Sequence, residues 1–233
     1  MSKIGIIGAM ELEVEALKST MDIEKTVTRA GMTFCEGTLN GASVVVVRSG
    51  IGKVNAALCV QILADLFEVT HVINTGVAGS LNAALDIGDI LISRIALHHD
   101  MDATNFGYPL GEVPQMGITE FPADQHLIEL SALTMAEVLP ELHSVVGRVV
   151  SGDQFIAEKS VKERLIREFR GDCCEMEGAA IAHGCYLNNI PFVILRAISD
   201  KADDSAHMDY PTFECKAADH CAKLVTALVA KIK

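Results

Sequence analysis

The 233-residue sequence has no tryptophan, only six prolines and 5% aromatic residues, and none of its apolar runs is long enough to span a membrane. Half of the residues are nevertheless hydrophobic, so we expect them to fill a core or a subunit interface, without membrane contact. Positive charge is scarce, since 19 basic residues against 31 acidic ones leave a net charge of −12. A field of that sign repels phosphate backbones and argues against nucleic acid as a partner.

Signals for metal binding and for export are weak or missing. The seven cysteines include no pair of CxxC motifs, and Met1-Ser2-Lys3 leads into a strand pattern without the apolar region of a signal peptide. We expect reduced thiols in a cytoplasmic protein, with Cys173 and Cys174 filling the core rather than acting in redox chemistry. The one metal-like cluster is His98-His99-Asp100-Met101-Asp102. Neighbouring residues of a strand point to opposite faces, so we expect no metal and no cofactor.

Short apolar runs alternate with helical patterns along the whole chain, and the unbroken run from Phe192 to Leu195 predicts a strand buried on both faces of a parallel sheet. This alternation predicts an α/β fold with a largely parallel sheet, and the lack of linkers and repeats predicts one domain over residues 1–233. Asn40-Gly41 is a strong hairpin signal between a strand pair over 27–39 and the run at 44–47. Helices are expected near 123–139, 158–169 and 210–232. A further helix after Lys53 is expected to bury Val54, Ala57, Leu58, Ile62 and Leu66.

Glycines are concentrated in a predicted strand at 4–8 and in the segments 48–53 and 75–79, which are expected to be turns that follow strands. Residues 5–8 lack the G-x-G-x-x-G dinucleotide fingerprint, and residues 48–53 lack the P-loop pattern G-x-x-x-x-G-K-[ST]. The segment 48–53 is therefore interpreted as a tight turn that lets a ligand approach the backbone. Thr75-Gly76-Val77-Ala78-Gly79 is expected to be the second such turn after a strand at 71–74.

Glu13, Glu177 and Asp200 each lie at or just beyond the predicted carboxyl end of a strand. If the strands are parallel, these acids converge on one opening. Local structure offers an alternative, because acids suit the first turn of a helix and Ser199 or Asp200 could cap the next helix. Together with Met10, Met176 and Phe155, the acids suit a nucleoside: apolar groups pack on base and sugar, and paired carboxylates can act as general acid and base at a glycosidic bond.

Several ordered motifs resemble those of the bacterial 5′-methylthioadenosine/S-adenosylhomocysteine nucleosidases, which belong to the nucleoside phosphorylase superfamily. The resemblance covers essentially the whole chain, and it implies a mixed, barrel-like central β-sheet flanked by helices in a homodimer. The motifs are Ile-Gly-Ile-Ile-Gly-Ala-Met-Glu at 4–11, Ser-Gly-Ile-Gly-Lys-Val at 49–54, Asn-Thr-Gly-x-Ala-Gly at 74–79, Ser-Gly-Asp-x-Phe-Ile at 151–156, Met-Glu at 176–177 and Arg-Ala-Ile-Ser-Asp at 196–200.

The resemblance also implies roles for individual residues. Asp200 would protonate N7 of adenine with help from Ser199, Glu13 would activate water, and Glu177 would hold the ribose hydroxyls beside Met176. Further substrate contacts are implied for Phe155 and Ile156 at adenine, for Met10, Ile51 and Tyr210 at the alkylthio end, and for Val77 and Arg196. Ala103, Phe106 and Pro114 would close the pocket of the partner subunit. Tyr210 is a mild variation on the family's bulky aromatic residue there.

Two rival functions differ in testable ways. A purine nucleoside phosphorylase would hold phosphate with arginines near the glycine-rich turns, but the first turn carries Glu11 and Glu13, which would repel a dianion. A catalytically silent nucleoside-binding protein is expected to lack at least one of the three acids. The sequence does not rank methylthioadenosine, S-adenosylhomocysteine, 5′-deoxyadenosine and aminofutalosine as the main substrate.

Overall fold

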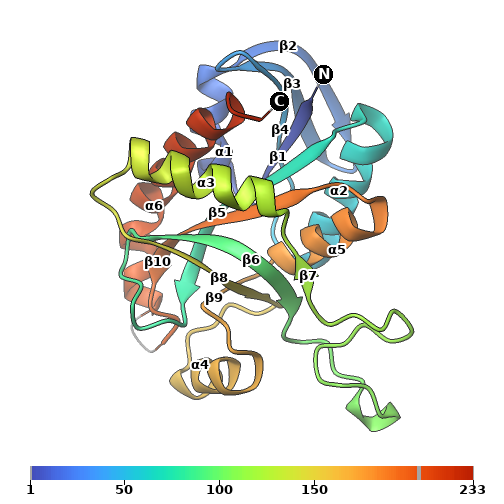
Figure 1. The fold of residues 1–233 in the computed structure, drawn as a ribbon, viewed down its shortest axis with the longest axis vertical. Coiled ribbons are helices and arrows are strands. Elements are labelled where there is room, and N and C mark those ends of the chain that lie inside the picture. Colours follow the sequence, from blue (N-terminus) through green and yellow to red (C-terminus); the bar gives the residue numbers. More distant parts are fainter. Residues whose placement is uncertain (1, 204–205, 233) are drawn as a thin grey trace.

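A mixed β-sheet runs through the computed structural model, which describes residues 2–203 and 206–232 (Figure 1). The strands are β1 (Lys3–Gly8), β2 (Asp22–Arg29), β3 (Met32–Leu39), β4 (Ala42–Arg48), β5 (His71–Ser80), β6 (Ile90–His98), β7 (Phe121–Pro122), β8 (Ser144–Ser151), β9 (Cys173–Glu175) and β10 (Phe192–Asp200). The helices are α1 (Glu11–Thr20), α2 (Lys53–Phe67), α3 (Gln125–Val138), α4 (Lys159–Arg164), which continues as a π-helical turn, α5 (Gly178–Asn188) and α6 (Ala206–Val229).

Five of the strands close into a barrel. The order β10-β6-β8-β9-β5 is completed by direct pairing of β5 with β10, and β1, β4, β3 and β2 extend the sheet from β5. Strands β1, β4, β5 and β10 pair in parallel, whereas β6 runs antiparallel to β10 and β9 runs antiparallel to β5. The predicted α/β class with a mixed, barrel-like sheet is confirmed.

Helices cover both faces of the sheet. In β10, Val193 and Leu195 pack in the core under α1, α3 and α6, while Phe192 and Ile194 pack in the core under α2 and α5. Successive side chains of a strand point to opposite faces, so an unbroken apolar run is what a strand covered on both sides requires. The apolar runs of β1 and β4 divide between the two cores in the same way.

One of the expected chain breaks is wrong. Residues 75–79 are not a turn, because β5 continues through them to Ser80. Small residues in β5 make room for side chains that cross it: a Cβ on Gly76 would lie 2.3 Å from Glu13 Oε1. Helix α6 begins at Ala206, so neither Ser199 nor Asp200 caps it, and the helix-cap alternative is excluded.

The predicted buried face of α2 is also wrong. Val54 is 71% exposed and Leu58 is 47% exposed. The side that packs against α5 and the sheet consists of Ala56, Cys59, Val60, Leu63 and Phe67. Both stripes have helical spacing, and a helix that is apolar nearly all round does not reveal from its sequence which side meets the core.

The helices expected near 123–139, 158–169 and 210–232 are present, with ends that differ by a few residues. Asn40 and Gly41 both have positive φ and join β3 to β4 in the predicted hairpin, while β2 begins at Asp22, five residues earlier than expected. Residues 99–120 form a mostly irregular segment, which we call the arm; it extends away from the sheet at the lower edge of Figure 1. Among the described helices, none has the length and apolar character needed to cross a membrane.

Candidate active site

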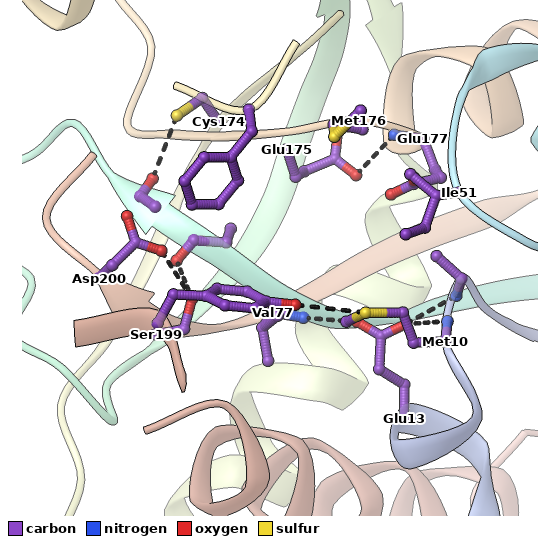
Figure 2. A pocket seen from close by; sticks show the side chains of 15 residues that line it. Met10, Glu13, Ile51, Val77, Cys174, Glu175, Met176, Glu177, Ser199 and Asp200 are labelled. Atoms are coloured by element: carbon purple, nitrogen blue, oxygen red, sulfur yellow. Dashed lines mark hydrogen bonds between the residues drawn. The ribbon is translucent and has the colours of Figure 1, made fainter. Parts of the chain in front are cut away.

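A cavity of about 360 Å³ opens where β1, β5 and β10 reach their carboxyl ends. Open α/β sheets bind ligands at this edge, because the loops that follow parallel strands meet there. Figure 2 shows Ser199 and Asp200 at one end of the cavity and Met10 and Glu13 at the other. The lining residues are Ala9, Met10, Glu13, Ile51, Val77, Ala78, Gly79, Phe155, Cys174, Glu175, Met176, Glu177, Ser199, Asp200 and Tyr210.

The first turn of α1 holds Glu13 in the cavity wall. Its Oε2 accepts hydrogen bonds from the amides of Ala9 (2.7 Å) and Met10 (2.9 Å), and its Oε1 accepts one from the amide of Val77 (3.1 Å). Burial raises the pKa of Glu13, although Arg196 and these three amides oppose the rise. The carboxylate is therefore fixed in direction and is a stronger proton acceptor than an exposed glutamate.

Asp200 ends β10 at the opposite side of the cavity. Its Oδ2 accepts a hydrogen bond from the Ser199 hydroxyl (2.9 Å), and its Oδ1 accepts one from the amide of Ala202 (2.8 Å). Burial raises the pKa of Asp200, while these two donors lower it. A carboxyl group with a raised pKa holds its proton closer to neutral pH, as a general acid must.

Glu177 lines the cavity at the start of α5. Its Oε1 accepts a hydrogen bond from the amide of Gly52 (2.8 Å). Burial, with the neighbouring negative charge of Glu175, raises the pKa of Glu177 to about 8. Met176 lines the cavity beside it, so a carboxylate and a thioether face the same space.

Arg196 does not reach the cavity wall. The side chain is 2% exposed and lies beneath the floor, where it pairs with Glu175 and donates to Asn74 Oδ1 (2.6 Å). Burial alone would raise the pKa of Glu175, but the Arg196 guanidinium holds it below its usual range. Arg196 thus neutralises one acid of this site and also attracts the charge of Glu13.

Of the other predicted site residues, one lies in a recess beside the cavity and three lie outside it. Ile156 lines a small recess that adjoins the main cavity and is shared with Gly79, Phe155, Cys174 and Asp200. Ala103, Phe106 and Pro114 lie on the arm and line none of this cavity. Phe106 is 86% exposed, so the arm presents an apolar ring to its surroundings.

Sequence reasoning missed Glu175 as a site residue. It lines the cavity and accepts hydrogen bonds from Ser151, from Arg196 and from the amides of Glu177 and Gly178. A usable signal was present, because residues two apart in an extended segment share a face and Glu177 was already singled out. Cys174 and the backbone of residues 78–79 were missed as well, and their small or apolar side chains carry no comparable signal.

The histidine cluster shows no metal-like arrangement. His98 packs against Phe121 and His183, whereas His99 packs against Phe169 on the other side. Burial lowers the pKa of His98 to about 4, so its ring is neutral at physiological pH. In the part of the chain that the structure describes, no three His, Cys, Asp or Glu side chains are grouped to hold an ion.

In this barrel-like α/β sheet, three buried acids line a cavity at the carboxyl ends of parallel strands. This arrangement is typical of α/β enzymes that bind a small ligand at that edge of the sheet. A family model described as "Phosphorylase superfamily" matches residues 3–230, and the chain belongs to this superfamily.

Three known proteins show how similar the relatives are. A 5′-methylthioadenosine/S-adenosylhomocysteine nucleosidase from Chromohalobacter salexigens is 43% identical over 100% of this chain and 98% of its own. The crystal structure of a nucleosidase of the same name from Neisseria meningitidis, in complex with methylthio-immucillin-A, has a TM-score of 0.96 at 38% identity and full coverage of both chains. A futalosine hydrolase of Helicobacter pylori has a TM-score of 0.93 at 34% identity and covers 99% of this chain and 98% of its own.

Proposed function

We propose that this chain is an N-ribosyl hydrolase that cleaves 5′-methylthioadenosine and S-adenosylhomocysteine to adenine and the 5-substituted ribose. The observation that carries the proposal is the convergence of Glu13, Glu177 and Asp200 on one cavity, each with a raised pKa and each held by hydrogen bonds. The names of the relatives support the same substrates.

Each acid has a distinct task in the proposed reaction. The bond from C1′ of ribose to N9 of adenine breaks, and its electron pair moves onto the base, which Asp200 protonates at N7. Glu13 takes a proton from the water that attacks C1′, and Glu177 accepts hydrogen bonds from the ribose hydroxyls. Acid and base therefore work at opposite ends of the scissile bond, as their separation in the cavity allows.

Apolar side chains of the cavity would contact the adenine and the 5′ substituent of the ligand. We assign adenine to the recess of Phe155 and Ile156, which adjoins Asp200. The 5′ substituent is assigned to the end formed by Met10, Ile51 and Tyr210, where the Tyr210 hydroxyl lies 3.2 Å from Met10 Sδ. 5′-Deoxyadenosine and aminofutalosine share adenine and ribose with methylthioadenosine and differ from it at the 5′ position, so we assign the choice among these substrates to this end of the cavity.

Charge favours hydrolysis over phosphorolysis. Of the described residues that line the cavity, three are glutamates and one is an aspartate, while none is lysine or arginine. Arg196 is paired with Glu175 beneath the floor and is not available to an anion. A phosphate dianion would therefore meet carboxylates without a compensating cation, whereas a neutral water molecule would not be repelled.

Adenine release from 5′-methylthioadenosine should therefore be independent of phosphate. With purified protein, we expect the same initial rate in phosphate-free buffer and in about 50 mM phosphate, with the ionic strength of the two buffers matched. The sugar product should be free methylthioribose. Chromatography of the sugar separates the outcomes. Release that requires phosphate and yields the 1-phosphate would show that the chain is a phosphorylase, and no release in either buffer would favour a silent binding protein.

The exposed apolar surface supports a homodimer of single-domain chains. Val54 and Leu58 of α2 and Phe106 of the arm are all exposed, and the resemblance places the arm residues Ala103, Phe106 and Pro114 in the partner's pocket. We propose that these surfaces meet across a two-fold axis, because Val54 and Leu58 lie four residues apart on one face of α2 and form an exposed apolar stripe of the kind that marks interfaces. Sedimentation equilibrium should give twice the chain mass, and a monomer at micromolar concentration would contradict the proposal. A cytoplasmic location stays a prediction.

A further inference from the structure

Three charged residues from motifs without an assigned role form one hydrogen-bonded cluster, which we call the clasp. Lys53 comes from the glycine-rich turn, Asp100 from the His-His-Asp sequence and Asp153 from Ser-Gly-Asp. Lys53 Nζ donates to Asp100 Oδ1 (2.6 Å), and the amide of Asp153 donates to Asp100 Oδ2 (3.0 Å). The backbone amide of Lys53 donates to Asp153 Oδ1 (2.8 Å), which closes the triangle.

The charges of the clasp are partly shielded from water. The side chains of Lys53 and Asp100 are 21% and 22% exposed. Burial alone would raise the pKa of Asp100, but the ammonium of Lys53 and the amide of Asp153 hold it below its usual value. Asp100 is thus ionised and bonded through both oxygens, a geometry that is stronger than that of a typical exposed ion pair.

One side of the clasp orients Glu177. Helix α2 begins with Gly52 as its N-cap residue, which has no side chain to satisfy the first amides. Carboxylates from two distant segments do so instead: Glu177 accepts from the amide of Gly52, and Asp153 accepts from the amide of Lys53. The position of this helix end therefore determines where the Glu177 carboxylate points.

The other side of the clasp holds the segment that forms the recess. Phe155 and Ile156 follow Asp153 by two and three residues, and both line the recess that adjoins Asp200. The backbone of Asp153 is tied to Asp100, and its side chain is tied to α2. The clasp thus joins the two walls between which a nucleoside would lie, although Lys53 and Asp100 line none of the cavity.

We infer that Lys53, Asp100 and Asp153 are positioning residues that set the spacing between the carboxylate of Glu177 and the Phe155 segment. This inference rests on the proposed function, because it assigns ribose to the first wall and adenine to the second. Asp200 and Glu13 are held by β10 and α1 through other bonds. Loosening the clasp should therefore weaken substrate binding more than it slows the chemical step.

Lys53→Met tests the inference, because it removes the ammonium and keeps the backbone amide and the length of the side chain. We expect KM for 5′-methylthioadenosine to rise roughly tenfold, as loss of a charge-assisted hydrogen bond implies, with kcat changed by less than about threefold. The dissociation constant of adenine, measured by calorimetry, should rise in parallel. Lys53→Arg should restore both values.

Lys231→Met is the matched control. It removes an ammonium from another surface ion pair, that of Lys231 with Glu137, which is remote from the cavity lining. We expect its KM and adenine affinity to equal those of the unchanged protein. If Lys53→Met does not fold, Asp100→Asn, which neutralises the partner, decides the question by the same measurements.

These measurements test the role of the clasp and the proposed function separately. A lower melting temperature with unchanged KM and adenine affinity would overturn the inference and leave the clasp a structural feature. A loss confined to kcat would overturn it too. If the unchanged protein binds adenine but releases none from the nucleoside, the proposed function fails, and the adenine affinities still decide whether the clasp positions the recess. If the unchanged protein does not bind adenine, both fail.

Discussion

Asp200→Asn is expected to lower kcat for 5′-methylthioadenosine by about 10²–10⁴-fold, the usual contribution of a general acid. Asparagine has nearly the same shape as aspartic acid, and its carbonyl oxygen can still accept from the amide of Ala202. Its amide has no proton that it can give to the leaving base. Adenine would then have to depart as an anion or take its proton from water, so the barrier rises while binding is retained.

Steady-state kinetics and adenine calorimetry on the Asp200→Asn variant test this assignment together. Asp86→Asn is a suitable control, because it makes the same replacement at a surface residue that pairs with Lys201 and lines none of the active-site cavity. Full activity of the Asp200→Asn variant would remove Asp200 from the role of acid. Loss of adenine binding with loss of activity would instead point to a collapsed site.

Glu13→Gln is expected to reduce kcat by a similar factor, about 10²–10⁴-fold. The three amides that aim the carboxylate place its charge toward the cavity, and burial makes it a stronger base. Glutamine is neutral and does not take a proton from water. KM should change little if Glu13 acts mainly on water, because the nucleoside itself is bound by other residues.

Glu11→Gln gives a matched control for this variant. Glu11 occupies the same first turn of α1, but its side chain is half exposed and pairs with Lys18. The same replacement there should leave kcat unchanged, so a loss in both variants would indicate a general effect of charge at the helix start. A fully active Glu13→Gln enzyme would require another base, and Glu177, whose pKa is raised to about 8, would be the next candidate.

Several features of the fold were readable from local pattern. The run from Phe192 to Leu195 predicted a strand covered on both faces, and its residues do alternate between two cores. Asn40-Gly41 predicted a hairpin, because this pair adopts positive φ at both positions without strain. These predictions succeeded because neighbours in the sequence decide them.

The errors share a physical cause. The small residues 75–79 were expected to form a turn, but they belong to β5, where they leave space for Glu13 and Arg196 to approach the strand. The α2 stripe of Val54 and Leu58 was expected inside, but packing against α5 selects the opposite stripe. In both cases distant parts of the chain choose between structures that the local pattern allows equally.

Most strands and helices, the three acids and the motifs that place the chain in its superfamily are readable from the amino-acid order. The folded chain was needed to show that Arg196 lies beneath the cavity paired with Glu175, that Glu177 takes its direction from the start of α2, and that Lys53, Asp100 and Asp153 meet. The reason is distance along the chain: hydrogen bonds between residues 21 to 125 positions apart depend on how the barrel closes, which no local pattern encodes.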